Sequence, residues 1–203
     1  HTLIGGIIGA VMVSAGWEAI KLPGLTKVLV ALFIFPLIGF ASGFIFTRLI
    51  YFLAQHATPR INDFFKRSQL VTAIILGLSH GTNDAQKSMG IIVLGLVISG
   101  RLQSFEVPLW VTVASAASMA IGTSLAGWKI IRTLGGKFYK IRPLHSFATQ
   151  LTSGIVILSA SFFGAPVSTS HVVSSAIIGV GASERLSKVR WSVAGDILTA
   201  WLI

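Results

Sequence analysis

The run from residue 70 to residue 99 is apolar and long enough to cross a lipid bilayer, yet it holds two formal charges near its middle. These charges are Asp84 and Lys87, and the sequence around them, LSHGTNDAQKSMG, adds an imidazole, amides and hydroxyls. Charges at bilayer depth are costly and survive mainly where they line an ion or substrate path. This polar segment is therefore the first candidate for a functional site.

Composition favours a membrane protein. The chain of 203 residues has 11% charged residues and a mean hydropathy of +0.82, whereas soluble domains carry about 25% charged residues. Cysteine is absent, which excludes disulfides and thiolate metal sites. The net charge of +10 would suit nucleic acid, but the basic residues lie in short loops between apolar spans. We therefore expect an all-α, polytopic membrane protein with no nucleic-acid partner.

The apolar segments predict how the chain crosses the membrane. Pro36 is expected to kink the second segment without ending it, and the fifth segment has 41 residues, about twice the length of one crossing. Gly164-Ala165-Pro166 lies at its middle, so we predict a helix–break–helix hairpin there. The predicted segments are residues 1–17, 28–53, 70–99, 108–128, 143–183 and 191 onward.

The basic residues test this topology. Twelve of the 16 Lys and Arg residues fall in three stretches, 48–67, 129–142 and 185–190. All three are cytoplasmic if the fifth segment enters the membrane and returns to the same side, as the positive-inside rule requires. A single crossing would place the third basic loop outside. The charge distribution therefore favours the hairpin.

Two stretches of the chain are similar to each other. Residues 171–179 (HVVSSAIIG) resemble residues 1–9 (HTLIGGIIG), and the predicted topology orients them in opposite directions. Transporters are commonly built from such inverted-topology repeats, although chance similarity remains an alternative. We expect the end of a first repeat at 1–54, a cytoplasmic linker at 55–69 and a second repeat at 70–203, all part of a longer polypeptide.

The polar segment of the third span is the first of two predicted breaks in the helices. Asn83 and Asp84 offer oxygen ligands for a hard cation, or a proton acceptor. Lys87 lies on the same face as Asp84 if the helix continues, and a structural ion pair is the alternative. His80 is a candidate proton relay. Its spacing from Asp84 would suit a metal, but two ligands are too few, so no metal or cofactor is predicted.

The second break is the sequence PVSTSH at residues 166–171. Pro166 ends one half-helix, and Ser168, Thr169 and Ser170 begin the next, where exposed amides and the helix dipole attract anions. The alternative is N-capping with helix–helix hydrogen bonds. His171 is a second candidate proton relay, although a single His here is more often a structural partner. Together the breaks suggest one midplane site for a cation or proton and an oxyanion; enzyme motifs are absent from the sequence.

At these residues the chain resembles the inorganic phosphate transporter (PiT) family. Its members carry two G-x-N-D motifs and two P-x-S-[ST]-[ST]-H motifs in inverted halves. GTND at 81–84 and PVSTSH at 166–171 are similar to the second copies, and His1 is similar to the last residue of the first hydroxyl motif. The resemblance covers the end of the first repeat and most of the second.

The resemblance implies a phosphate symporter in a multi-pass cell membrane, specifically a bacterial inner membrane, with a homodimer as one candidate assembly. It is not expected to be an enzyme. The substrate-binding residues would be Asn83, Ser168, Thr169 and Ser170, and the ion-coupling residues would be Asp84, Asn83 and Lys87.

One position departs from the family pattern. Many Na⁺-coupled members continue the motif as N-D-V-[AS]-N-A, and here Lys87 stands at the second Asn. A fixed ammonium could take the electrostatic place of Na⁺ beside Asp84. We therefore favour H⁺ over Na⁺ as the coupling ion, with phosphate as the free ion or as a neutral metal complex, as in similar bacterial members. A sulfate transporter and an anion channel are the alternative functions, and an intramembrane hydrolase is a distant third.

Overall fold

The computed structural model describes residues 2–136 and 141–202. His1, the expected end of the first hydroxyl motif, lies outside the described residues, as do Lys137 and Lys140 of the second basic stretch. The described part is helical without strands, which confirms the all-α prediction. Its helices are α1 (Thr2–Ala15), α2 (Leu22–Leu53), α3 (Ile61–Ile98), α4 (Leu109–Gly136), α5 (Pro143–Phe162), α6 (Thr169–Glu184) and α7 (Trp191–Leu202), with 3₁₀ turns η1 (Trp17–Ala19) and η2 (Leu186–Lys188).

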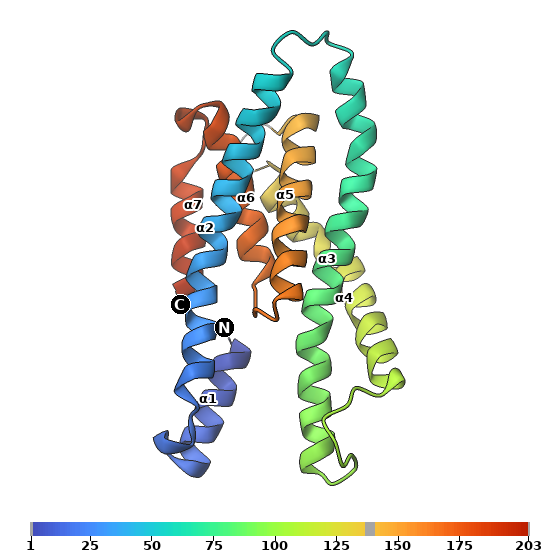
Figure 1. Cartoon of the computed structure of the whole chain (residues 1–203). Helices are drawn as coiled ribbons and strands as arrows, with labels where there is room; N and C mark the ends of the chain where they lie inside the picture. Colours follow the sequence, from blue (N-terminus) through green and yellow to red (C-terminus); the bar gives the residue numbers. More distant parts are fainter. Residues whose placement is uncertain (1, 137–140, 203) are drawn as a thin grey trace.

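Most of the described connections between helices lie at two ends of the molecule (Figure 1). The α2–α3 loop, the start of α5 and the segment after α6 lie at one end, which we call the basic end. The loops that follow α1 and α3 lie at the opposite end. This arrangement agrees with the topology predicted from the basic stretches.

Helix α2 is the most apolar long element of the described chain. It is 32 residues long with a window of mean hydropathy 2.5, and it alone of the described helices meets the length and hydropathy of a membrane span. Two shorter apolar helices lie at Leu3–Ala15 and Leu109–Leu125. Pro36 lies inside α2, and the helix continues across it as expected.

The predicted hairpin is present as α5 and α6. Its tip, residues 163–168, lies about halfway along the molecule, and both arms run from there to the basic end (Figure 1). The Ala165 N–H donates to the Ala160 carbonyl at 2.9 Å, and Gly164 has φ +61°, which a residue with a side chain rarely adopts. Glycine therefore allows the chain to leave α5 and turn toward α6.

The predicted break in the third span is wrong, because α3 is continuous from residue 61 to residue 98. Two of its hydroxyls bond within the helix: the Ser79 hydroxyl donates to the Ile75 carbonyl at 2.6 Å, and the Thr82 hydroxyl donates to the Leu78 carbonyl at 2.8 Å. Each glycine destabilises a helix by only about 1 kcal/mol relative to alanine, so the packing of α3 against its neighbours outweighs this cost. The same helix includes residues 61–69, which were expected to be linker.

Two close helix pairs position the hairpin between α2 and α3. Helix α2 meets α6 backbone to backbone: a Cβ on Gly39 would lie 2.8 Å from the Val172 carbonyl oxygen, and one on Gly179 would collide with the Phe40 carbonyl. Small residues permit such close approach in membrane helices. On the other side α3 packs along α5, so the tip of the hairpin is presented to the middle of α3.

Candidate functional site

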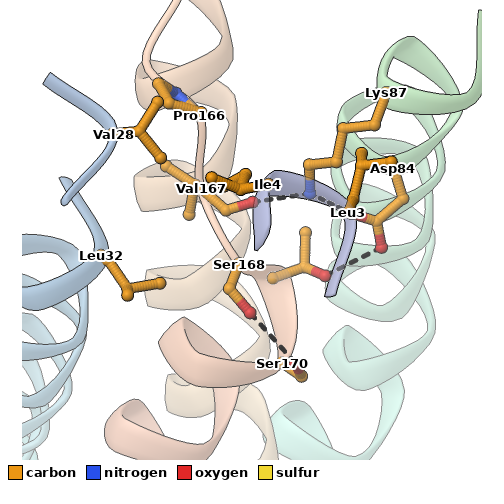
Figure 2. A pocket seen from close by; sticks show the side chains of 11 residues that line it. Leu3, Ile4, Val28, Leu32, Asp84, Lys87, Pro166, Val167, Ser168 and Ser170 are labelled. Carbon is orange, nitrogen blue, oxygen red and sulfur yellow. Dashed lines mark hydrogen bonds and ion pairs between the residues drawn. The ribbon is translucent and has the colours of Figure 1, made fainter. Parts of the chain in front are cut away.

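A cavity of about 190 Å³ lies where the hairpin tip faces the middle of α3 (Figure 2). Its polar wall is formed by Asp84 and Lys87 from α3 and by the start of α6. Its apolar wall is formed by α1 and the first half of α2. The lining residues are Leu3, Ile4, Val28, Leu32, Asp84, Lys87, Pro166, Val167, Ser168, Thr169 and Ser170.

Asp84 is the centre of the polar wall. Its Oδ1 accepts a hydrogen bond from Lys87 Nζ at 2.6 Å, and its Oδ2 accepts one from the Thr169 hydroxyl at 3.0 Å. His80 Nε2 lies 3.4 Å from the same Oδ2. Because α3 is continuous here, Asp84 and Lys87 share one face of the helix, as the spacing predicted. The carboxylate thus joins two parts of the chain that the sequence analysis treated as separate motifs.

Lys87 connects α3 to the hairpin tip. Its Nζ donates to the Val167 carbonyl oxygen at 2.7 Å as well as to Asp84 (Figure 2). The Lys87 side chain is 38% exposed and that of Asp84 is 23% exposed, so both are half-buried beside the cavity. The pair leaves the site nearly neutral, and the ammonium is held at the wall by these two acceptors. The sequence could not reveal the Val167 contact, because it uses a backbone carbonyl.

The start of α6 supplies uncharged donors to the same cavity. Ser168 is the N-cap residue, yet its side chain does not cap the helix and lies 3.3 Å from the Ser170 hydroxyl. The Val172 N–H donates to the Ser168 carbonyl, which is the first backbone hydrogen bond of α6. The N–H groups of residues 169–171 therefore belong to the unsatisfied first turn of the helix. Helix N-termini with free amides favour anions. The predicted hydroxyls Ser168, Thr169 and Ser170 therefore all reach one wall of the cavity.

Asn83 lies beside the cavity rather than on its wall. It is 3% exposed, and its Nδ2 donates to the Ser161 hydroxyl of α5 at 2.9 Å. Its Oδ1 is buried and accepts no hydrogen bond from the described residues. This amide holds α3 against the hairpin arm, and Ser161 is a partner that the sequence analysis did not identify.

The two histidines occupy different surroundings. His80 Nε2 lies 3.4 Å from Asp84 Oδ2, and His80 also lines a second cavity of about 680 Å³ between α3 and α4. His171 is buried in α6, where its ring stacks on Trp201 with centroids 4.0 Å apart. Within the described residues, His, Cys, Asp and Glu side chains form no group of three that could hold a metal. His80 is thus the histidine in contact with the site's carboxylate.

In this arrangement, the tip of a helical hairpin presents hydroxyls to a carboxylate and an ammonium near the middle of the molecule. Such interrupted helices around a polar site are typical of membrane transport proteins. A model of the phosphate transporter family matches residues 1–203. The chain therefore belongs to the phosphate transporter family, which is a family of integral membrane proteins.

Relatives with curated names agree. The chain is 42% identical to a Bacillus subtilis (strain 168) protein over 205 residues and 41% identical to one from Rhizobium meliloti (strain 1021), each named "Probable low-affinity inorganic phosphate transporter". These alignments cover 100% of this chain, which spans 62% and 61% of the relatives' lengths. A solved structure titled "The sodium-dependent phosphate transporter" has the same fold, with a TM-score of 0.88 at 19% identity, over 98% of this chain and 67% of that one.

Proposed function

We propose that this chain is part of a secondary active transporter that carries inorganic phosphate across a membrane together with H⁺. The observation that carries the proposal is the cavity in which the start of α6 faces the Asp84–Lys87 pair. The names of the relatives support phosphate as the substrate. The excess of basic residues at one end supports a cytoplasmic location for that end, in a bacterial inner membrane.

The cavity offers phosphate two kinds of recognition. Hydroxyls of Ser168 and Ser170, with the first-turn amides of α6, can donate hydrogen bonds to phosphate oxygens. Thr169 acts through Asp84, to which its hydroxyl already donates. Lys87 supplies the positive charge. Donors without charge suit an anion that must also leave, because each bond is modest in strength.

The charge balance of the site supports coupling to H⁺. As it stands, Asp84 neutralises Lys87 at 2.6 Å. A proton on Asp84 would end that neutralisation and leave the ammonium to balance one negative charge of phosphate. Loading a proton and then the anion keeps the site near neutrality, which matters in a low-dielectric environment. His80, whose Nε2 lies 3.4 Å from Asp84, is the proposed proton relay, whereas the ring of the second candidate, His171, stacks on Trp201.

Labelled phosphate uptake by the full-length protein in vesicles tests the substrate. We expect uptake that saturates, that excess unlabelled phosphate suppresses and that equal sulfate leaves largely intact. Equal suppression by sulfate would favour the sulfate alternative. Flux that fails to saturate would favour an anion channel. Repeating the assay with and without divalent cations separates free phosphate from a neutral metal complex.

Lys87→Asn tests the coupling ion. The substitution removes the fixed cation beside Asp84, so we expect Na⁺-free phosphate uptake to fall about tenfold or more, as expected for losing a charged hydrogen bond. Added Na⁺ should restore part of the uptake. Arg101→Asn, in the exposed loop after α3, is the matched control and should change nothing. A wild type that already requires Na⁺ and ignores the proton gradient would refute the proposal.

A further inference from the structure

A second polar cluster lies at the basic end, far along the hairpin from the cavity. Its members are Tyr51 near the end of α2, His145 in the first turn of α5, Glu184 at the end of α6 and Arg142 just before α5. These elements are separate in sequence but meet at one end of the molecule (Figure 1). The proposed transport chemistry uses none of these four residues.

His145 is the centre of this cluster and is only 1% exposed. Its Nε2 lies 3.0 Å from the Tyr51 hydroxyl and 3.5 Å from Glu184 Oε2. Its Nδ1 accepts the backbone N–H of Arg142 at 3.3 Å, which places the ring proton of a neutral imidazole on Nε2. The ring therefore binds groups from α2, α6 and the α5 N-terminus at once.

Neighbouring contacts extend this connection to α3. The Gln69 amide of α3 donates to the Pro143 carbonyl at 2.8 Å, and the Phe147 ring packs against Phe65 of α3 with centroids 5.3 Å apart. Arg142 Nη1 lies 3.7 Å from Glu184 Oε1, the carboxylate oxygen that does not face the His145 ring. At the basic end, one group of contacts thus holds α2, α3, α5 and α6 together.

From this geometry we propose that Tyr51, His145 and Glu184 form a latch that keeps the basic-end side of the transporter closed. The inference rests on the proposed transport function. The hairpin arms run from the cavity to the basic end, so a substrate leaving toward that end must pass along them, and the latch joins both arms to α2. A buried polar network is stable when complete and costly when one partner is missing, so it favours two discrete states, closed and open.

This chain contains no cysteine, so the full-length protein, with any cysteine outside this chain replaced by serine, permits a labelling test. One reporter is Ala148→Cys, at a fully buried position of α5 near the basic end, probed with a membrane-impermeant thiol reagent from that side. The other is Leu32→Cys, on the cavity wall, probed from the opposite side. Latch variants are Tyr51→Phe and Glu184→Gln, which keep the shape of each side chain, and the control is Glu106→Gln in an exposed loop.

In both latch variants we expect labelling at position 148 to rise about fivefold, as for the loss of one hydrogen bond, and labelling at position 32 to fall. The control should match wild type. An increase at both positions would indicate general loosening and would overturn the latch, as would no change at either. Labelling needs no phosphate, so absent phosphate uptake in wild type would refute the proposed function and leave this readout intact.

Discussion

Asp84→Asn should reduce phosphate transport by at least about a hundredfold. The carboxylate accepts hydrogen bonds from Lys87 at 2.6 Å and from Thr169 at 3.0 Å, and it is the proposed proton carrier. The amide cannot take up a proton, and it leaves the half-buried ammonium without its counter-charge. Loss of the proposed proton carrier stops the coupled step itself, so we expect a fall of at least about two powers of ten, which corresponds to roughly 2.7 kcal/mol in the barrier. Initial rates of labelled uptake at matched protein levels measure the effect.

The matched control for this variant lies on the same helix. Asp63 is exposed in the first turn of α3, at the basic end and away from the cavity. Asp63→Asn makes the same chemical change, and we expect uptake within about twofold of wild type, as is usual for exposed substitutions. If both variants lose transport equally, the effect of Asp84→Asn comes from helix stability, and the proposed role of the carboxylate is contradicted.

Gly179→Ala should have the largest effect on stability. At this position α6 lies against the backbone of α2, and a Cβ would collide with the Phe40 carbonyl oxygen. The backbone of α2 cannot move aside as the end of a flexible side chain can. The two helices must therefore move apart to accommodate the added methyl group. Overpacking of this kind costs about 1–3 kcal/mol, and more where backbone must move. Thermal unfolding of the purified protein in detergent, together with its yield, measures the loss.

Gly95→Ala is the corresponding control. Gly95 lies in α3, and apart from its chain neighbours and the adjacent backbone of α3, no atom of the described residues lies within 4 Å of a Cβ built there. Alanine is a better helix former by about 1 kcal/mol, so this variant should be as stable as wild type or slightly more stable. Equal destabilisation by both substitutions would show that the close α2–α6 contact does not explain the effect.

Much of the fold could be predicted from the sequence because membrane topology leaves strong signals. The length of the fifth segment, Pro166 at its middle and the basic loop after it together predicted the hairpin. The hydroxyls at the start of α6 were predicted for the same reason, since a helix that begins after proline exposes its first turn. The spacing of Asp84 and Lys87 predicted that they share one face if the helix continues, and the continuous α3 confirms this; the ion pair, which was the alternative interpretation, is also present.

The remaining features depend on contacts between distant residues. The predicted break in α3 was wrong because side-chain to backbone bonds within the helix satisfy its hydroxyls, and polarity alone does not reveal this. The Val167 carbonyl that binds Lys87 has no sequence signal, since every residue carries a carbonyl. His145 and Tyr51 are 94 positions apart, so their contact depends on the packing of α2 against α5.

The most direct test of the central claim is phosphate uptake by the full-length protein in sealed liposomes, driven by an imposed pH gradient in the absence of Na⁺. We expect phosphate to accumulate while the gradient lasts, accumulation to stop when the gradient is dissipated, and Asp84→Asn to abolish it. Accumulation that requires Na⁺ and is indifferent to the pH gradient would contradict H⁺-coupled phosphate transport.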